Sequence, residues 1–183
     1  DTSYDTYNCI VIRRDNQLEE LRLCFEQIFS LYASLALISS TNLEQLKIDF
    51  IRTIFGKCLI DNLDAKLENI GLIFNEKNNN YRIPPSYDNG LAFSSYKSVS
   101  IPHCCVGNQY FEIPLIIDFL LENYLDNIKD IVDNLDDVIN SLDRLISKYM
   151  LDNSKKQYVI EYMSEINKKI KQKLNKERKL WKL

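Results

Sequence analysis

The sequence predicts a mainly α-helical fold: a helical bundle with a long C-terminal helical hairpin and a small β element near residues 91–111. Apolar residues recur at steps of three and four over long segments, which is the period of a helix that buries one face. Glycine and proline occur only four times each among 183 residues, fewer than a protein of many tight turns needs. Both observations favour long helices over a β-sandwich or barrel.

We expect residues 1–183 to form a single domain, because the length suits one core of ordinary size. The domain has three consecutive parts: N-terminal helices over 10–74, a loop with short strands over 75–111, and the helical hairpin with its basic end over 112–183. Hydrophobic residues make up 45% and charged residues 27% of the chain, which is typical of a folded domain rather than a disordered one.

The first helix is predicted after a short strand or extended arm in "YNCIVIRRD", residues 7–15. Its apolar stripe begins at Leu18 and ends at Ala36, and Asp15 or Asn16 is available as the N-cap. Polar residues follow and interrupt the period. This helix is therefore expected to bury one side and expose the other.

A second helix is predicted from a capping box, because Thr41 is followed three positions later by Glu44. Gly56 either ends or bends this helix, since a helical period continues through Cys58, Leu63 and Leu67 almost to Gly71. The next segment, residues 75–90, is rich in Asn, Pro, Asp and Gly and is predicted to be a loop. Loose alternation over 91–106 then predicts one or two short strands.

The strongest pattern begins at Pro114, which suits the first turn of a helix. An unbroken helix from Pro114 to Met150 would be about 55 Å long. Its apolar residues fall at heptad positions a (Leu121, Ile128, Leu135, Leu142, Tyr149), d (Ile117, Tyr124, Ile131, Val138, Leu145) and e (Leu125, Val132, Ile139, Ile146). Because a coiled-coil dimer normally keeps charge at e, packing within the chain's own bundle is favoured over a dimeric zipper.

The last helix carries an apolar stripe of Val159, Met163, Ile166, Ile170 and Leu174 and ends in a basic segment. From Lys168 onward there are eight Lys or Arg against one Glu, a local charge of +7, so residues 1–167 carry −10 within the total of −3. The candidate binding residues of this segment are Lys168, Lys169, Lys171, Lys173, Lys176, Arg178, Lys179 and Trp181.

The basic segment has three interpretations. It contacts nucleic acid, with Trp181 stacking on a base, or it serves as a membrane-surface or partner helix. Alternatively, it lies antiparallel on the predicted long helix that begins at Pro114, whose outer face is acidic. The third is favoured because an acidic helix, a short turn and a basic helix form a self-complementary hairpin. The pI near 5.3 argues against a dedicated nucleic-acid binder.

The weak catalytic candidates are His103, Cys104 and Cys105, which include the single histidine of the chain. Adjacent residues on a strand point to opposite faces, so at most one of the two thiols can serve a given site. A metal site would need further ligands at a recognisable spacing, and a nucleophile would need an oriented base. We therefore interpret the cysteines as core thiols and predict no metal site and no cofactor.

Five cysteines without a repeated spacing predict an intracellular, reducing compartment, most simply the cytoplasm, with the nucleus as the alternative. No apolar run is long enough for a transmembrane helix. The leading functional hypothesis is a non-enzymatic interaction or assembly module whose hairpin binds a protein partner or a second copy. The alternative is an intracellular enzyme, either a Cys/His hydrolase or a nuclease of a helical defence or toxin type.

Overall fold

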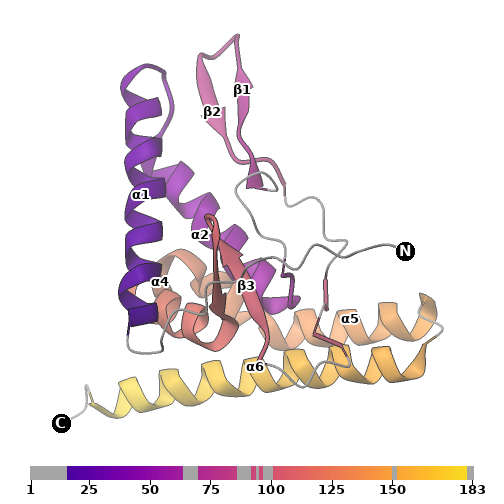
Figure 1. The fold of residues 1–183 in the computed structure, drawn as a ribbon. Helices are drawn as coiled ribbons and strands as arrows, with labels where there is room; N and C mark the ends of the chain where they lie inside the picture. The colour runs from indigo at the N-terminus through magenta and orange to yellow at the C-terminus, as the bar shows by residue number, and fades with distance from the viewer. Residues whose placement is uncertain are drawn as a thin grey trace, which may run out of the picture.

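The computed structural model describes residues 16–63, 70–85, 92–93, 95–96, 101–149 and 152–180. This part of the chain is mainly helical with two small antiparallel hairpins, so the predicted fold class is confirmed. The helices are α1 (Gln17–Leu37), α2 (Leu43–Leu59), α4 (Ile113–Asp133), α5 (Leu135–Tyr149) and α6 (Asn153–Leu180), and the strands are β1 (Ile73–Asn75), β2 (Asn80–Arg82), β3 (His103–Val106) and β4 (Gln109–Glu112). Figure 1 shows α6 along the base, with α5 beside its N-terminal half.

An aromatic cluster joins α1, α2 and α4. The ring of Phe25 lies 5.1 Å from that of Phe119 and 5.4 Å from that of Phe50, both in edge-to-face geometry, and it stacks on Tyr124 at 5.8 Å. Such pairs contribute beyond the burial of their area. The α1 stripe predicted from the sequence supplies this core, except that Leu18 at its start is exposed.

The start of α2 differs from the prediction. Asn42, rather than Thr41, is the N-cap, and its side-chain oxygen accepts a hydrogen bond of 3.1 Å from the backbone N–H of Gln45. The Thr41 hydroxyl instead accepts a hydrogen bond of 2.8 Å from the backbone N–H of Tyr81 in β2. The capping-box prediction was therefore wrong, because a long-range contact recruits the hydroxyl that it assigned to the cap.

The end of α2 also differs, because the helix passes through Gly56 and stops at Leu59 instead of continuing toward Gly71. The backbone N–H of Asn62 donates to the carbonyl of Lys57 (2.9 Å), and that of Asp61 donates to the carbonyl of Cys58 (3.2 Å). These two bonds make a Schellman motif, with Asp61 at the left-handed position, φ 47°. The predicted extension over 64–69 lies outside the described residues.

The β1–β2 hairpin falls partly in the segment predicted to be a loop. This prediction was wrong at residue 75 and over 80–82, which are strand, whereas residues 76–79 form the turn between the strands. Both strands have only three residues, and β1 is exposed along its length. The hairpin is tied to the α1–α2 turn, because the backbone N–H of Ser40 donates to the carbonyl of Asn79 at 2.7 Å. The strand predicted over residues 7–15 lies outside the described part of the chain.

The predicted β element near residues 91–111 takes shape in its second half as the β3–β4 hairpin. Gly107 begins its two-residue turn with φ 67°, a conformation that favours glycine. Of the earlier predicted strand residues, 92–93 and 95–96 form turns, so the prediction was wrong there. The other residues between 91 and 100 are outside the described ranges.

The predicted unbroken helix is interrupted twice. Tyr124 has non-helical angles (φ −139°, ψ 24°), and α4 ends at Asp133 before α5 begins at Leu135. At the second break the Asn134 amide donates to the carbonyl of Asp130 at 2.7 Å. Beyond it, α5 packs on α6 with a stripe of Leu135, Ile139 and Ile146, while the d-position residues Val138 and Leu145 are exposed.

The last helix follows its prediction. The Asp152 carboxylate accepts hydrogen bonds from the backbone N–H groups of Ser154 (2.9 Å) and Lys155 (3.1 Å), which satisfies two orphan donors at the start of α6. The predicted stripe is buried from Val159 to Ile170. Among the described helices, none combines the length and apolar character that a membrane crossing requires.

Candidate functional site

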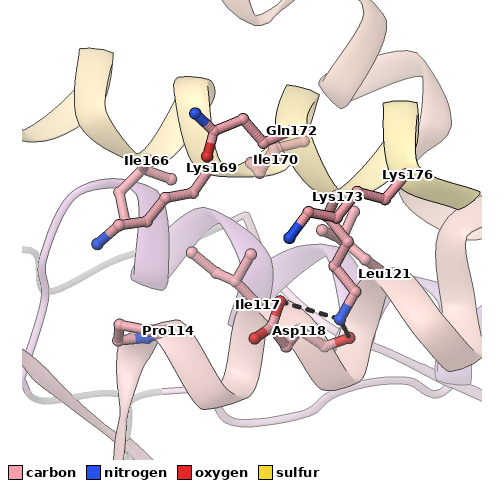
Figure 2. Close-up of a pocket in the computed structure, with 10 residues that line it drawn as sticks. All are labelled: Pro114, Ile117, Asp118, Leu121, Ile166, Lys169, Ile170, Gln172, Lys173 and Lys176. Atoms are coloured by element: carbon pink, nitrogen blue, oxygen red, sulfur yellow. Dashed lines mark hydrogen bonds and ion pairs between the residues drawn. The ribbon is translucent and has the colours of Figure 1, made fainter.

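A groove lies between the first half of α4 and the second half of α6 (Figure 2). It encloses about 370 Å³, and its apolar lining comes from Pro114, Ile117, Leu121, Ile166 and Ile170. The four aliphatic side chains are also part of the continuous hydrophobic core. The groove floor is therefore the outer surface of the core where the two helices pack, with each of these four side chains at most 4% exposed.

Lysines form the rim on the α6 side. Lys169, Lys173 and Lys176 line the groove at steps of four and three residues, so the helical period places them on one face of α6 (Figure 2). Lys169 and Lys176 are separated by two turns, about 10 Å along the axis. The same period sets Ile166 and Ile170 beneath them, and thus apolar floor and basic rim arise from one stretch of sequence.

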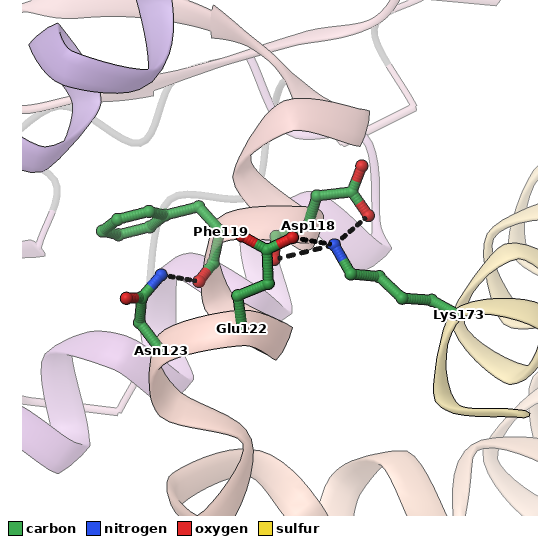
Figure 3. A network of polar contacts seen from close by, with 5 residues as sticks. All are labelled: Asp118, Phe119, Glu122, Asn123 and Lys173. Atoms are coloured by element: carbon green, nitrogen blue, oxygen red, sulfur yellow. Dashed lines mark hydrogen bonds and ion pairs between the residues drawn. The ribbon is translucent and has the colours of Figure 1, made fainter. Parts of the chain in front are cut away.

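Lys173 is the most strongly engaged of the three lysines. Its ammonium group lies 2.9 Å from Asp118 Oδ1 and 2.7 Å from Glu122 Oε1, both on α4 (Figure 3). Partial burial opposes the charge, but the hydrogen bonds to Glu122 and Asp118 outweigh it and raise the pKa of Lys173. Lys173 thus links the two walls of the groove as a cation.

The same lysine also binds the backbone of α4 near its kink. Its ammonium group also donates to the carbonyl of Asp118 at 3.3 Å, and the Asn123 amide donates to the carbonyl of Phe119 at 2.8 Å (Figure 3). Both carbonyls belong to the turn that precedes Tyr124, where the regular ladder is interrupted. Side-chain donors from Lys173 and Asn123 therefore bind backbone carbonyls in the turn next to the kink.

Lys169 and Lys176 remain available to a ligand. Lys169 pairs with Glu165 one turn earlier at 3.0 Å, an exposed contact of the kind that contributes only a few tenths of a kcal/mol. Lys176 is exposed and has no ion pair within the described part of the chain. These two lysines can therefore bind an anionic partner without breaking a strong contact within the chain.

A second hollow of about 250 Å³ extends the groove toward the β3–β4 hairpin. It shares Pro114, Ile166 and Lys169 with the first hollow and reaches Ile101, which is 41% exposed. From Tyr162 to Lys176 the combined groove follows α6 for about 20 Å. This length corresponds to four turns of a helix.

The other predicted lysines lie away from the groove. Lys171 pairs with Asp136 on α5 at 2.6 Å, and the Asn167 amide donates to the same carboxylate. The hydrogen bonds from Lys171 and Asn167 lower the pKa of Asp136. Lys168 is exposed and does not line the groove, and the side chains of Arg178, Lys179 and Trp181 are outside the described residues.

The thiol candidates are in the core. Cys104 and Cys105 are buried on β3, and His103 at the start of the strand is half-buried opposite Glu112. Burial raises the pKa of the Cys58 thiol well above its ordinary value, and a hydrogen bond with Cys104 adds to the shift. A nucleophilic thiol needs access to substrate, whereas Cys104 and Cys105 are at most 1% exposed. The geometry therefore matches the interpretation of these cysteines as core residues.

Sequence reasoning missed a buried carboxylate at Asp61. It accepts hydrogen bonds from the backbone N–H of Ser95 (2.8 Å), the Ser95 hydroxyl (2.9 Å) and the Tyr158 hydroxyl (2.9 Å). Burial raises the pKa of Asp61, although these bonds act in the opposite direction. An aspartate after a helix is common, so the sequence offered no specific signal for it.

In the described ranges, no three side chains of His, Cys, Asp or Glu gather closely enough to bind a metal ion.

No family model matches the sequence, and searches of curated proteins and of solved structures returned no match. The groove geometry, rather than similarity, is therefore the basis for a functional proposal.

Proposed function

We propose that the protein is a non-enzymatic interaction module that binds an acidic amphipathic helix of a protein partner in the groove between α4 and α6. The observation that carries the proposal is the combination of an apolar floor with a basic rim along one groove. A helix that enters such a groove inserts one apolar stripe and keeps its charged flanks at the edges. Acidic flanks fit the lysines of this rim.

The dimensions favour a short helix as the occupant. The groove follows α6 for about 20 Å, which matches a helix of about 14 residues at 1.5 Å per residue. Apolar side chains at positions i, i+3 or i+4, and i+7 of the partner would lie over Ile117, Leu121 and Ile166. Acidic side chains beside that stripe would then face Lys169 and Lys176, two turns apart.

A protein partner is favoured over nucleic acid. Asp118, Glu122 and Glu165 lie among the groove lysines, so the available cations are separate points rather than the continuous positive track that a phosphate backbone follows. The net charge of the whole chain is −3, whereas nucleic-acid binding rests mainly on a surplus of positive charge. An apolar floor contributes to binding when apolar side chains cover it, as a helix provides.

The two parts of the groove have different expected roles. The lysines are exposed, so they should mainly steer association and fix the orientation of the bound helix. The apolar floor should determine how long the helix stays bound, because the excluded water returns on dissociation.

Thiol catalysis, by contrast, would require an opening of the core around Cys104.

A display library tests the proposal. It consists of helical 14-residue segments with leucine fixed in one stripe and all other positions randomised. We expect selected binders to be enriched in Asp and Glu, and the double substitution Lys169→Glu with Lys176→Glu to abolish their binding. Lys168→Glu is the control for Lys169→Glu and Lys176→Glu taken singly, since each reverses one charge and only Lys168 lies outside the groove.

The outcome that contradicts the proposal is equally concrete. Selection of neutral or basic segments, or binding that the Lys168 control weakens as much as the groove variant, would mean that the groove is not the site. If a labelled single-stranded oligonucleotide bound the native chain but not the groove variant, the ligand of the groove would be nucleic acid rather than a protein helix.

A further inference from the structure

We propose that two copies of the chain associate through the outer faces of their α5 helices, packed antiparallel about a two-fold axis. The face is defined by Val138 and Leu145, which lie one heptad apart and are 44% and 57% exposed. The neighbouring stripe of α5 is already buried against α6, through Leu135, Ile139 and Ile146. The exposed pair therefore forms a second apolar edge on α5, which the described part of the chain leaves about half exposed.

The charges beside this edge identify the occupant. Asp137 and Arg144 precede Val138 and Leu145 by one residue each, so they lie on the same flank, two turns apart. Both are exposed, and in the described part of the chain neither has an ion pair. The flank is thus acidic near the start of α5 and basic near its end.

Such a polarity is self-complementary only in the antiparallel direction. With the two-fold axis near Ser141, Val138 of one copy faces Leu145 of the other, and Asp137 comes within reach of Arg144. Symmetry repeats both contacts, as in any isologous interface. A parallel pair would place the two Asp137–Arg144 flanks on opposite sides of the contact, so neither ion pair could form. The small side chain of Ser141 leaves space for a close approach at the centre.

The expected dimer is weak. α5 has 15 residues, about 22 Å, so the contact is well below the area of a standard stable interface. The dimer should therefore form in a concentration-dependent way. The α5 face and the α4–α6 groove share no residue, so the self-association can fail while the proposed helix binding holds, and the reverse.

Sedimentation equilibrium of the full chain tests the inference, over a range from about 10 μM to about 1 mM, where weak interfaces are populated. We expect the apparent mass to rise from 21.5 kDa toward twice that value. Leu145→Glu should weaken association at least tenfold. Asp137→Arg and Arg144→Asp should each weaken it severalfold, and the double exchange should restore it. Circular dichroism and thermal unfolding verify that each variant is folded.

The charge exchange makes the test specific. A chain that stays monomeric over the whole range, or a dimer that Leu145→Glu leaves intact, would overturn the proposal. Folded single variants whose double exchange does not restore association would also overturn it, because only the antiparallel arrangement predicts the rescue.

Discussion

The Tyr158 hydroxyl lies 2.9 Å from a carboxylate oxygen of Asp61, and this bond joins the start of α6 to the end of α2. Asp61 occupies the left-handed position of a helix C-cap, which glycine usually fills. A non-glycine residue there adds backbone strain. The carboxylate compensates for this strain by binding donors from Ser95 and Tyr158, which come from different parts of the chain.

Tyr158→Phe should lower the free energy of unfolding by about 1–2 kcal/mol, because a carboxylate loses one of its hydrogen-bond donors inside the protein. Chemical denaturation provides the measurement. Tyr81→Phe is a suitable control, since Tyr81 packs on Phe74 in the exposed β1–β2 hairpin. Equal effects of the two substitutions would contradict the role assigned to the Tyr158–Asp61 bond.

The raised pKa of Asp61 gives a pH dependence with a definite sign. Because the folded state has the higher pKa, Asp61 stabilises the fold most below its ordinary pKa of 3.8, and this contribution is lost as the pH rises through the folded value. The difference in unfolding free energy between the native chain and Asp61→Asn should therefore fall from acidic to neutral pH. Carboxylates such as Asp136 cancel in this difference, and a difference that increases with pH would refute the assignment.

Two glycines form a matched pair, since an added Cβ meets nothing within 4 Å at either position. Gly107→Ala should destabilise the protein by about 1–2 kcal/mol, because its φ of 67° is unfavourable for alanine. Gly56→Ala should stabilise it by about 0.5–1 kcal/mol, because Gly56 lies inside α2. Opposite shifts in the melting temperature are expected, and shifts of the same sign would be inconsistent with this backbone geometry.

The lysines of α6 should differ in their effects on stability. Lys173→Met removes the ion pairs with Asp118 and Glu122 and should lower the unfolding free energy by about 0.5–1 kcal/mol. The expected effect is small because both carboxylates are exposed and solvent screens the two ion pairs. Lys171→Met should have a smaller effect, and Lys168→Met none. High salt should reduce the Lys173 effect. If all three variants were alike at low salt, the link between the groove walls would have no energetic weight.

Much of the helical architecture could be predicted because it is local. The stripes of α1 and α6 follow directly from residue spacing, and so does the row of lysines on α6. The two breaks in the long helix could not be predicted from the spacing of apolar residues, because this spacing continues through Tyr124 and Asn134. Tyr124 leaves the helical conformation where its ring packs against Phe25, a contact between distant segments.

The β1–β2 hairpin and the groove illustrate the same limit. Three-residue strands without alternating burial have no periodic signal, and bonds from the α1–α2 turn hold this hairpin in place. The lysines of the groove could be found from their spacing, but its far wall comes from α4. Which face of α4 meets α6 depends on the tertiary packing, and the sequence pattern alone did not specify it.

The groove is expected to select its ligand by charge. To test this, the affinity of two segments is measured: an acidic binder from the 14-residue library, and the same segment with every Glu and Asp replaced by Lys. Each segment is measured with two proteins, the native chain and the variant that combines Lys169→Glu with Lys176→Glu. We expect an exchange of preference, in which the native chain binds the acidic segment and the variant binds the basic one. An acidic segment that binds both proteins with equal affinity would contradict it.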